Sequence, residues 1–402
     1  MSTPANTQIL VAGGGFVGAT MALASANAGF ETLLLDANAA PPSDSRDPRA
    51  SMLSASSLQL LKRLGVLDGI ESSLQPVEEM VVSHGSRSGG CSPFFLTFPQ
   101  EKTLRSPPLA HMIENRHLRE GLEHAVQRRK GLRRHAPAKV IRCEAHKRNR
   151  IEVRLEGGGT VNANLCIAAD GARSQLRADA GIETTGWRYG AHALTAVLAH
   201  EREHHGVAHE YFLPSGPFAI LPLPGRRFSL VWTETPRAAD ALTRCSEEVF
   251  LEEAKRCTGG RYGKLSLESK RLAYPVQLQL ARRYGAEGLL LAGDAAHVVH
   301  PLAGQGLNMG LQDVIALEEL LEESARLGLS LDSSMLLERY ERKRRFDNFV
   351  MAAITDGTHR LFQGEGDVLR VLRDVCLGTA QASPWILALG ERLAGAPGTS
   401  GA

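Results

Sequence analysis

The sequence predicts an α/β fold, in which a Rossmann-like, dinucleotide-binding domain is interleaved with a β-sheet domain and followed by C-terminal helices. Three observations predict it. The composition is that of an ordinary globular protein, with 43% hydrophobic and 22% charged residues over 402 positions. The first forty residues have the pattern of a strand, a glycine-rich turn, a helix and a strand. Two further apolar strands, far along the chain, each end in an aspartate beside a glycine.

The N-terminal elements follow from short apolar runs and their stop signals. Residues 8–12 suit a strand that is buried on both faces. A helix is expected from Phe16 to about residue 29, where a glycine provides a natural stop. A second buried strand over residues 32–35 ends at Asp36, and an acid at that position suits the two hydroxyls of a free ribose.

The turn between the first strand and the helix has the spacing Gly13-x-Gly15-x-x-Gly18. Gly13 permits the sharp turn, Gly15 lets backbone N–H groups approach a pyrophosphate, and Gly18 lets the helix pack closely on the strand. The start of the helix, at Phe16 and Val17, offers its unsatisfied N–H groups to the anion. The alternative is a tight turn with a purely structural role.

Two later segments repeat the combination of a carboxylate and a glycine at a strand end. They contain Asp170-Gly171 and Gly293-Asp294. Taken alone, either aspartate could be a helix N-cap or a turn residue. Together with the first turn, they predict three separated segments that hold one extended dinucleotide along its length.

The remaining elements are expected from alternating and helical patterns. Two hairpins and another buried strand are expected at residues 151–155 with 161–169, 218–223 with 228–232, and 288–292. A long amphipathic helix over about residues 307–327 precedes a helical pattern from residue 336 onward, which includes a cationic run at 341–345.

Charge and cysteine content exclude several classes of function. Forty-six basic and 44 acidic residues give a net charge of +2, which argues against a nucleic-acid-binding protein. The six cysteines lie at least twelve positions apart, so CxxC redox pairs and CxxC zinc knuckles are excluded, no metal site is expected, and free thiols in a reducing compartment are favoured. No apolar run approaches the length of a spanning helix and no basic leader is present, so the sequence predicts a cytoplasmic protein.

The motifs in this order and at these distances resemble the FAD-dependent aromatic hydroxylases related to p-hydroxybenzoate hydroxylase. The segment from Gly293 to Gly310, GDAAHVVHPLAGQGLNMG, is similar to the signature of the ubiquinone-biosynthesis hydroxylases, which oxidise the ring of a polyprenylated phenol. Segments 47–54, 114–118 and 221–223 also resemble that family, and the likeness spans residues 8 to 380. Ser51-Met52 departs from the family, which is usually smaller or more aliphatic there.

The resemblance implies bound FAD, with NAD(P)H and O2 as co-substrates. In the family pattern Asp36 would hold the adenosine ribose, and Arg49 and Arg116 would lie beside the pyrophosphate and the flavin. Asp170 would lie near the pyrophosphate, and Asp294 would bind the ribityl chain. For Arg49 and Arg116 the alternative is a guanidinium on the surface.

The resemblance also implies that Pro301 and the loop from Gly304 to Asn308 flank the isoalloxazine ring, with a helix N-terminus facing its anionic edge. The expected cofactor-binding residues are Gly13, Gly15, Phe16, Val17, Gly18, Asp36, Arg49, Arg116, Asp170, Gly171, Gly293, Asp294, Pro301, Gly304, Gly306, Leu307 and Asn308.

The implied function is hydroxylation of the aromatic ring of a prenylated phenol in ubiquinone biosynthesis, through a flavin C4a-hydroperoxide. Such a site must exclude water, so an apolar sheet is expected over the pocket, with Leu53, Ile220 and Trp232 as lining residues. Two alternatives stay open. One is a flavoprotein reductase of isoprenoid double bonds, and the other is a non-catalytic FAD-binding scaffold.

The sequence contains no convincing general base. His297 and His300 are candidates, because imidazole titrates near neutral pH and both lie beside the expected flavin loop. The alternative is that both hydrogen-bond to the backbone and shape the loop. His300 and Pro301 are the residues expected to act on the flavin face.

A basic stretch over residues 128–150 is either a solvated face or a contact for anionic lipid or an acidic partner. The partners implied are the prenylated phenol, other ubiquinone-biosynthesis proteins or an anionic membrane surface, with no nucleic acid. The expected location is the cytoplasm, and a more specific expectation is peripheral attachment to the inner membrane face.

The expected domains follow the motifs. The FAD-binding domain takes residues 1–75, 107–182 and 276–340, the substrate domain takes residues 76–106 and 183–275, and a C-terminal helical segment with a tail takes residues 341–402.

Overall fold

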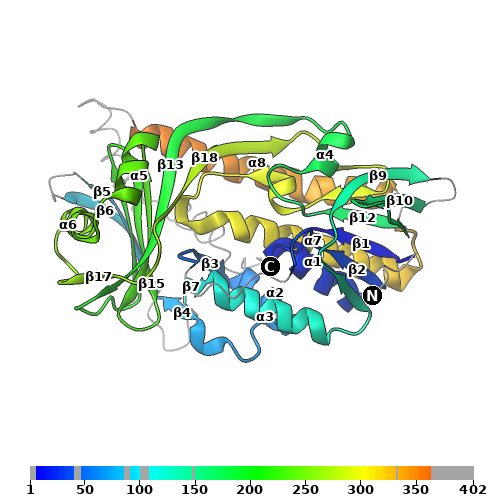
Figure 1. Cartoon of the computed structure of the whole chain (residues 1–402), viewed down its shortest axis with the longest axis horizontal. Helices are drawn as coiled ribbons and strands as arrows, with labels where there is room; N and C mark the ends of the chain where they lie inside the picture. The colour runs from blue at the N-terminus through cyan, green and yellow to red at the C-terminus, as the bar shows by residue number, and fades with distance from the viewer. Residues whose placement is uncertain are drawn as a thin grey trace, which may run out of the picture.

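A computed structural model describes residues 6–39, 47–85, 91–99, 108–146, 150–331 and 334–363 (Figure 1). One half of the molecule is built on a six-stranded sheet in the order β19-β20-β12-β1-β2-β8. Its strands are β1 (Ile9–Ala12), β2 (Thr32–Leu35), β8 (Leu132–His135), β12 (Leu165–Ala168), β19 (Gly285–Ala286) and β20 (Leu289–Leu291). All neighbours pair in parallel except β19, which runs antiparallel to β20 at the edge.

Helices cover this sheet and bury its apolar strands. They include α1 (Phe16–Asn27), α3 (Asn115–Arg128) and α7 (Gln305–Leu327). Every residue of β1, β2, β12 and β20 is buried, as expected for parallel strands with both faces covered. The predicted N-terminal strand, helix and second strand and the predicted helix over 307–327 are therefore confirmed.

The hairpin predicted at 151–155 with 161–169 is correct in its first part only. β10 (Arg150–Leu155) pairs with β11 (Thr160–Ala163), and β9 (Val140–His146) completes a three-stranded sheet. The run from 161 to 169 is not one strand, because it divides at Asn164 and β12 joins the six-stranded sheet. The continuous apolar pattern of β12 reflects burial on both faces, which differs from the alternation of β11.

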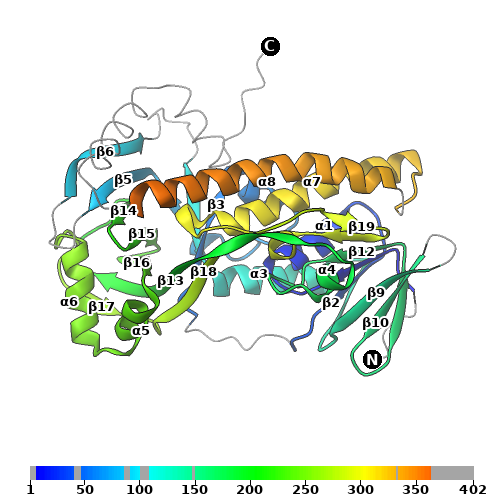
Figure 2. The same cartoon turned by 90° about the horizontal axis from the view of Figure 1, so that it is seen from above.

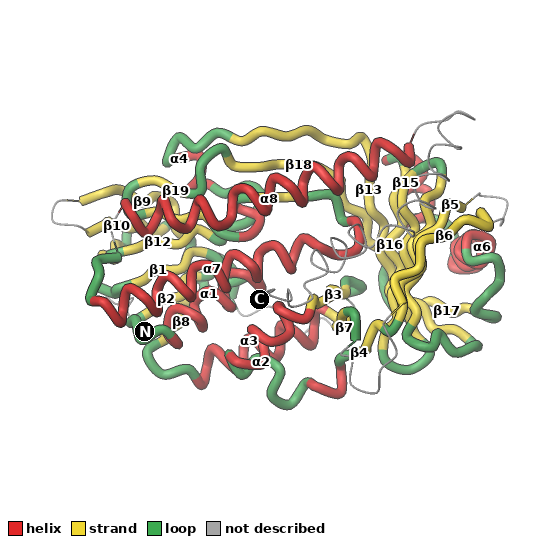
Figure 3. Tube along the Cα trace, turned by 180° about the vertical axis from the view of Figure 1, so that it is seen from behind, coloured by secondary structure: helices red, strands yellow, loops and turns green. Residues whose placement is uncertain are grey.

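The other half of the molecule is a nine-stranded sheet (Figure 3). Its main path is β21-β18-β13-β16-β15-β14-β5-β6, and β17 pairs with β13. The strands are β5 (Glu79–Gly85), β6 (Cys91–Pro99), β13 (Thr184–His200), β14 (Val207–Leu213), β15 (Gly216–Leu223), β16 (Arg227–Glu234), β17 (Leu265–Leu267), β18 (Leu272–Ala281) and β21 (His297–Val298). The predicted hairpin of β15 and β16 is confirmed.

Each face of this large sheet packs on a different partner. One face packs against α6 (Glu247–Cys257), which follows α5 (Pro236–Arg244). The other face meets a small sheet of β3 (Ala50–Ser54), β7 (Ala110–Glu114) and β4 (Gln75–Val77), which connects to α2 (Ala55–Arg63). The small sheet therefore lies between the two halves.

The two halves are interleaved along the chain, which confirms the predicted fold class. β13 and β18 form a long antiparallel pair, and the expected domain boundary at 275/276 falls inside β18. α8 (Ser334–Gln363) runs beside α7 and reaches the large sheet, and it begins before the expected start of the C-terminal segment at 341 (Figure 2). Residues 364–402 lie outside the described part. No helix in the described ranges is long and apolar enough to cross a membrane.

Candidate functional site

The first glycine turn is built so that side chains cannot enter it. Gly13 has a φ of +113°, and a Cβ there would lie 2.2 Å from the carbonyl oxygen of Ala169. A Cβ on Gly18 would lie 1.9 Å from the carbonyl oxygen of Gly13, so helix and strand are in backbone contact. Around Gly15 no atom lies within 4 Å of a Cβ position, and no side chain caps α1 there. The N-terminus of α1, at Phe16 and Val17, therefore opens toward free space, as a pyrophosphate site requires.

Asp36 borders a cavity of about 340 Å³ beside this turn. A Cβ on Gly14 would lie 2.1 Å from Oδ2 of Asp36, so the glycine turn and the carboxylate are adjacent. Oδ1 of Asp36 accepts a hydrogen bond from the backbone N–H of Asn38, and Arg134 lies 3.4 Å from Oδ2. Arg134 is also bound to Glu123 on the opposite wall, on α3. The cavity is thus lined by the residue types that bind a sugar with vicinal hydroxyls.

Asp170 has one carboxylate oxygen in use and one unused. Its Oδ2 accepts the backbone N–H groups of Gln175 (3.0 Å) and Leu176 (3.3 Å) at the start of α4 (Gln175–Asp179), which is the helix-cap role considered above. Its Oδ1 is buried and accepts no hydrogen bond from the described residues. A buried carboxylate oxygen without a donor fits a ligand that supplies a hydrogen-bond donor. The neighbouring Gly171 has a φ of +86°, in the left-handed region.

The Gly293-Asp294 turn packs directly on the first turn through Val17. Gly293 has a φ of +59°, and a Cβ there would lie 3.1 Å from Val17. A Cβ on Gly310 of α7 would lie 2.4 Å from Cγ2 of Val17. Asp294, in the short helix η2 (Gly293–Ala295), keeps exposed surface, while partial burial of its carboxyl raises the pKa of that group against the opposing charge of His297. The third turn thus presents an accessible carboxylate close to the first glycine turn.

Arg177 connects the second and third turns. Its guanidinium donates to the carbonyl oxygens of Ala295 (2.8 Å) and Ala172 (3.0 Å), and its side chain is buried. No motif predicts this residue, since its role follows only from the position of α4 in the fold. Arg177 therefore fixes the spacing of two turns that the sequence analysis treated as separate signals.

The loop that leads into α7 is open at its glycines. Pro301 is half-buried and precedes the short helix η3 (Leu302–Gly304). Gly304 is left-handed, with a φ of +63°, and α7 begins there without a side-chain cap. Gly306 is exposed, with no atom within 4 Å of a Cβ position, while Leu307 packs partly into the core. The N-terminal N–H groups of a 23-residue helix thus border an open space.

The three turns around Gly13, Asp170 and Gly293, with the cavity beside Asp36, are called the cradle below. Comparison with known proteins identifies the family to which the chain belongs. A family model described as an FAD binding domain matches residues 6–355. The chain belongs to this FAD-binding family.

Its curated relatives include hydroxylases of ubiquinone biosynthesis, which confirms the resemblance seen in the sequence. It is 38% identical over 375 residues to the ubiquinone hydroxylase UbiL of Rhodospirillum rubrum, covering 93% of this chain and 86% of that protein. It is 33% identical to the 3-demethoxyubiquinol 3-hydroxylase of Escherichia coli, covering 93% and 95%. The p-nitrophenol 4-monooxygenase PnpA of Pseudomonas putida has the same fold, with a TM-score of 0.78 at 21% identity over 98% of this chain and 100% of that one.

The cradle fits FAD on its own chemistry. It combines two glycine turns that a Cβ would fill, a cavity beside Asp36, an unused oxygen on Asp170 and an accessible carboxylate on Asp294. These groups are the donors and acceptors that an adenosine, a pyrophosphate and a ribityl chain need. The assignment of each residue to a part of FAD stays a prediction.

Arg49 and Arg116 come together at the ends of two paired strands. Ala50 of β3 pairs with Glu114 of β7, so both arginines emerge at the same edge. Arg49 is half exposed and pairs with Asp47 at 2.7 Å, while Arg116 lies 3.1 Å from Glu114. The buried Glu114 also binds Arg227 through two 3.0 Å hydrogen bonds. Both arginines are therefore held by carboxylates of their own segment.

Asn308 faces the protein with both atoms of its amide. Its Oδ1 accepts the backbone N–H of Ser54 at 3.0 Å, and its Nδ2 donates to the carbonyl oxygen of Met52 at 2.8 Å. These two hydrogen bonds attach the start of α7 to β3. The structure thus supports Asn308 as a residue that positions the flavin loop, and the departure from the family at Met52 lies in direct contact with that loop.

The three residues expected to line the substrate pocket are all in packed cores. Leu53 is fully buried in the core of the FAD-binding half. Ile220 and Trp232 belong to the cluster that packs on Phe250 of α6, on the far face of the large sheet. This corrects the expectation for a physical reason, since neighbouring residues of a strand point to opposite faces.

In β15 and β16, the side chains next to Ile220 and Trp232 point to the opposite face of the large sheet, toward the small sheet. Ala219, Leu221 and Val231 pack with Met52 and Met112 of the small sheet, between the two halves of the molecule. An apolar layer therefore lies between the large and small sheets, and it is made by the opposite set of side chains in the same two strands.

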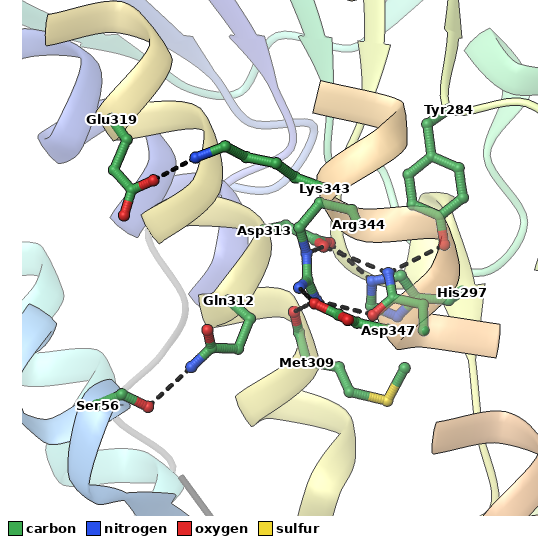
Figure 4. A network of polar contacts seen from close by, with 11 residues as sticks. Ser56, Tyr284, His297, Met309, Gln312, Asp313, Glu319, Lys343, Arg344 and Asp347 are labelled. Carbon is green, nitrogen blue, oxygen red and sulfur yellow. Dashed lines mark hydrogen bonds and ion pairs between the residues drawn. The ribbon is translucent and has the colours of Figure 1, made fainter. Parts of the chain in front are cut away.

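His297 belongs to a buried polar network (Figure 4). Its Nε2 lies 2.7 Å from Oδ2 of Asp313, and the same oxygen accepts the backbone N–H of Gly293 at 2.9 Å. Nε of Arg344 donates to Oδ1 at 2.8 Å, and Asn348 connects Arg344 to Tyr284. Burial raises the pKa of Asp313, but His297 and Arg344 outweigh it and hold that pKa at about 2. The contacts of His297 are those of a residue that shapes the loop.

His300 is enclosed by aromatic rings. It is fully buried, with the ring centroid of His359 on α8 at 4.4 Å and that of Tyr189 on β13 at 5.2 Å. No described residue hydrogen-bonds to either of its ring nitrogens. Burial, with a smaller contribution from His359, lowers the pKa of His300 to about 3. An imidazole with this pKa stays neutral near pH 7 and is a weak base, so the geometry favours a packing role beside Pro301.

Proposed function

We propose that this protein hydroxylates the aromatic ring of a prenylated phenol in ubiquinone biosynthesis, using bound FAD, NAD(P)H and O2. The observation that carries the proposal is the identity of 38% to a ubiquinone hydroxylase over 93% of the chain, joined to a cradle that fits FAD. When bound, FAD takes reducing equivalents from NAD(P)H and activates O2 for insertion into an electron-rich ring.

We propose the following roles for the residues of the cradle. Asp36 binds the adenosine ribose, and the N-terminus of α1 binds the pyrophosphate together with the unused oxygen of Asp170. Asp294 binds the ribityl chain. The uncapped N-terminus of α7 stabilises negative charge on the flavin edge by about 1 kcal/mol. Arg49 and Arg116 border the cofactor at the edge of the small sheet.

The chain's own side chains would keep water from the reacting ring. The apolar layer between the two halves contains Ala219, Leu221 and Val231 of the large sheet and Met52 of the small one. A dry site favours oxygen transfer over release of peroxide. Of the two candidate bases, His297 is buried with its Nε2 on Asp313 and His300 is buried with a lowered pKa, so we assign the protein the roles of orienting the ring, excluding water and stabilising charge.

One assay tests the proposal against its alternatives. The purified holoprotein is mixed with NADH or NADPH, O2 and a short-chain prenylated phenol, and the products are identified by mass spectrometry. We expect O2 consumption that depends on the phenol and a product heavier by one oxygen atom. Reduction of the isoprenoid chain without O2 uptake would indicate the reductase. A flavin that NAD(P)H does not bleach under anaerobic conditions would indicate the scaffold.

A further inference from the structure

α8 exposes two phenylalanines to solvent. Phe346 is 70% exposed and Phe349 is 61% exposed, the two highest values among the large hydrophobic side chains of the described residues. They are three positions apart on one helix and therefore lie on the same face. α8 itself lies along one long edge of the molecule (Figure 2). An exposed pair of this size on one face is a common mark of a binding surface.

Guanidinium groups flank these rings along the same face. Arg342 and Arg345 precede Phe346 and Phe349 by four positions, which is about one turn. Arg360 follows Phe349 by three turns, and its guanidinium lies 4.9 Å from the ring centroid of Trp187 on β13. Trp187 is itself 40% exposed. We call Phe346, Phe349 and Trp187 with Arg342, Arg345 and Arg360 the aromatic stripe, and it extends over about 27 Å of helix.

A groove of about 980 Å³ runs under this stripe. It is lined by Leu280 of β18 and by Leu337, Phe346 and Phe349 of α8, among others. Thr185 also lines it, two positions before Trp187 and so on the same face of β13. The groove and Trp187 are therefore parts of one continuous surface between α8 and β13–β18.

The charges around the groove favour an anionic partner. Arg282 and Arg283 also line the groove; Arg282 pairs with Glu183 at 2.8 Å, whereas Arg283 and Arg342 make no ion pair with the described residues. Three glutamates also line the groove: Glu287, Glu338 and Glu341.

Along α8 the two glutamates lie farther from the phenylalanines than Arg342 and Arg345 do. Glu341 is occupied, since it accepts the backbone N–H of Tyr284 and pairs with Arg345. Glu338 lies two turns before Phe346 on the helix. The nearest charged neighbours of the two rings on this face are therefore Arg342 and Arg345.

The basic stretch at 128–150 has a different character. Arg134 pairs with Glu123, Lys139 with Glu156, and Arg142 with Glu144. These pairs offset part of its positive charge, and no exposed large aromatic residue accompanies it in the described part. In the aromatic stripe Arg345 and Arg360 are also paired, with Glu341 and Asp356, so the exposed rings are what distinguish the stripe from this stretch.

We propose that the aromatic stripe is the surface by which this protein rests on an anionic lipid bilayer. The inference rests on the proposed function, since a prenylated phenol resides in a bilayer. Aromatic rings on a helix face insert at the level of the headgroups, and arginines beside them bind lipid phosphates. A peripheral protein of this kind would reach its substrate without a spanning helix.

Vesicle sedimentation of the holoprotein tests the proposal. The vesicles consist either of phosphatidylcholine alone or of equal parts phosphatidylcholine and phosphatidylglycerol. We expect binding to the anionic vesicles only. The double variant Phe346→Ser/Phe349→Ser is expected to weaken binding by about tenfold, and Arg283→Glu and Arg342→Glu by about fivefold each.

Matched controls come from other exposed positions. Val249→Ser removes an exposed hydrophobic side chain on α6, and Arg133→Glu reverses a charge in the basic stretch; both are expected to bind like the wild type. Bound flavin absorbance and the melting temperature show whether each variant is folded. As an independent measurement, brominated lipid is expected to quench tryptophan fluorescence in the wild type and much less in Trp187→Phe.

Several outcomes would overturn the proposal. These are equal binding to neutral and anionic vesicles, wild-type binding by the phenylalanine variant, or loss of binding only in Arg133→Glu. Sedimentation velocity that shows a dimer lost in the phenylalanine variant, without vesicle binding, would assign the surface to a second copy instead.

Failure of the proposed function is a separate result. It would leave vesicle binding intact while O2 uptake with a phenol is absent. Conversely, the phenylalanine variant is expected to keep wild-type turnover of a water-soluble phenol without a prenyl chain.

Discussion

Asp294 and Asp313 are neighbours in space, because Asp313 accepts a hydrogen bond from the backbone of Gly293, yet the fold surrounds them differently. Asp313 is fully buried among four donors, from Gly293, His297, Arg344 and Asn348, and its pKa is lowered to about 2. Asp294 is exposed, no described residue donates to it, and its pKa is raised. The hydrogen-bonding capacity of Asp313 is filled by the protein and supports the turn, while that of Asp294 is not filled by the described residues, which is consistent with the role proposed for it. The number of protein donors separates the two roles where residue type does not.

The largest effect is expected when the supporting carboxylate is removed. Asp313→Ala leaves the buried Arg344 without its partner and should lower the free energy of unfolding by about 3–5 kcal/mol, measured by urea denaturation. The control is Asp347→Ala, which removes the exposed partner of the same arginine and should cost less than about 1 kcal/mol. Equal losses of unfolding free energy in the two variants would show that the buried Asp313 does not stabilise the fold more than the exposed Asp347 does.

Replacing Asp294 should weaken FAD binding and leave folding unaffected. Asp294→Asn is expected to weaken FAD binding by about 10- to 150-fold, the range for hydrogen bonds to a charged group, measured by flavin fluorescence quenching with apoprotein. Because the folded state raises the pKa of Asp294, its ionised form opposes folding above the unfolded pKa. The apoprotein variant should therefore melt at the same or a higher temperature near neutral pH. Unchanged FAD affinity would refute the assignment.

The same comparison extends to two histidines, with a smaller expected effect. His297 has a carboxylate partner, whereas His300 has none among the described residues and its pKa is about 3. Since the unfolded chain binds the proton more readily, His300 contributes stability above its unfolded pKa of about 6.5 and loses it as pH falls. Between about pH 7 and pH 5 the loss is roughly 2 kcal/mol.

His300→Phe should flatten this pH dependence in urea denaturation. His359, in ring contact with His300, has a pKa that is also lowered by burial, so the double variant with His359→Phe should flatten it further. His205→Asn, on an exposed loop, is the control. A His300→Phe protein with the wild-type slope would show that the imidazole is stabilised by contacts other than those described.

The sequence predicted the parts of the site that local rules govern. Gly13 makes the sharp turn and Gly18 the close helix–strand contact that their spacing indicated, because a turn between a strand and a helix is decided within a few residues, while the pyrophosphate role of Gly15 stays a prediction. The strand ends at Asp36, Asp170 and Asp294 were located by the same reasoning. The three motifs together predicted segments that hold one extended dinucleotide, whereas the part of FAD expected at each aspartate came only from the family resemblance, since it depends on contacts distant in sequence.

The parts that were not predicted depend on which way a side chain faces. Ile220 and Trp232 were chosen correctly as strand residues, but the face of a strand that meets a pocket is fixed only by tertiary packing. Arg344 lies in a cationic run and has the composition of a solvated face. Arg344 is nevertheless buried, together with Tyr340 and Asn348, which lie four residues before and after it on the same face of α8. That spacing identifies the buried face only once α7 is known to lie beside the helix.

The order of strands in the six-stranded sheet has a consequence for biosynthesis. β1 and β2 emerge first from the ribosome, but β20 and the Asp294 turn follow only after nearly the whole large sheet has been made. Arg344, which secures that turn through Asp313, is translated later still. If Asp294 binds the cofactor as proposed, we expect a nascent chain to capture a flavin only after residue 294 has been made, and a chain interrupted before β20 to be released without it.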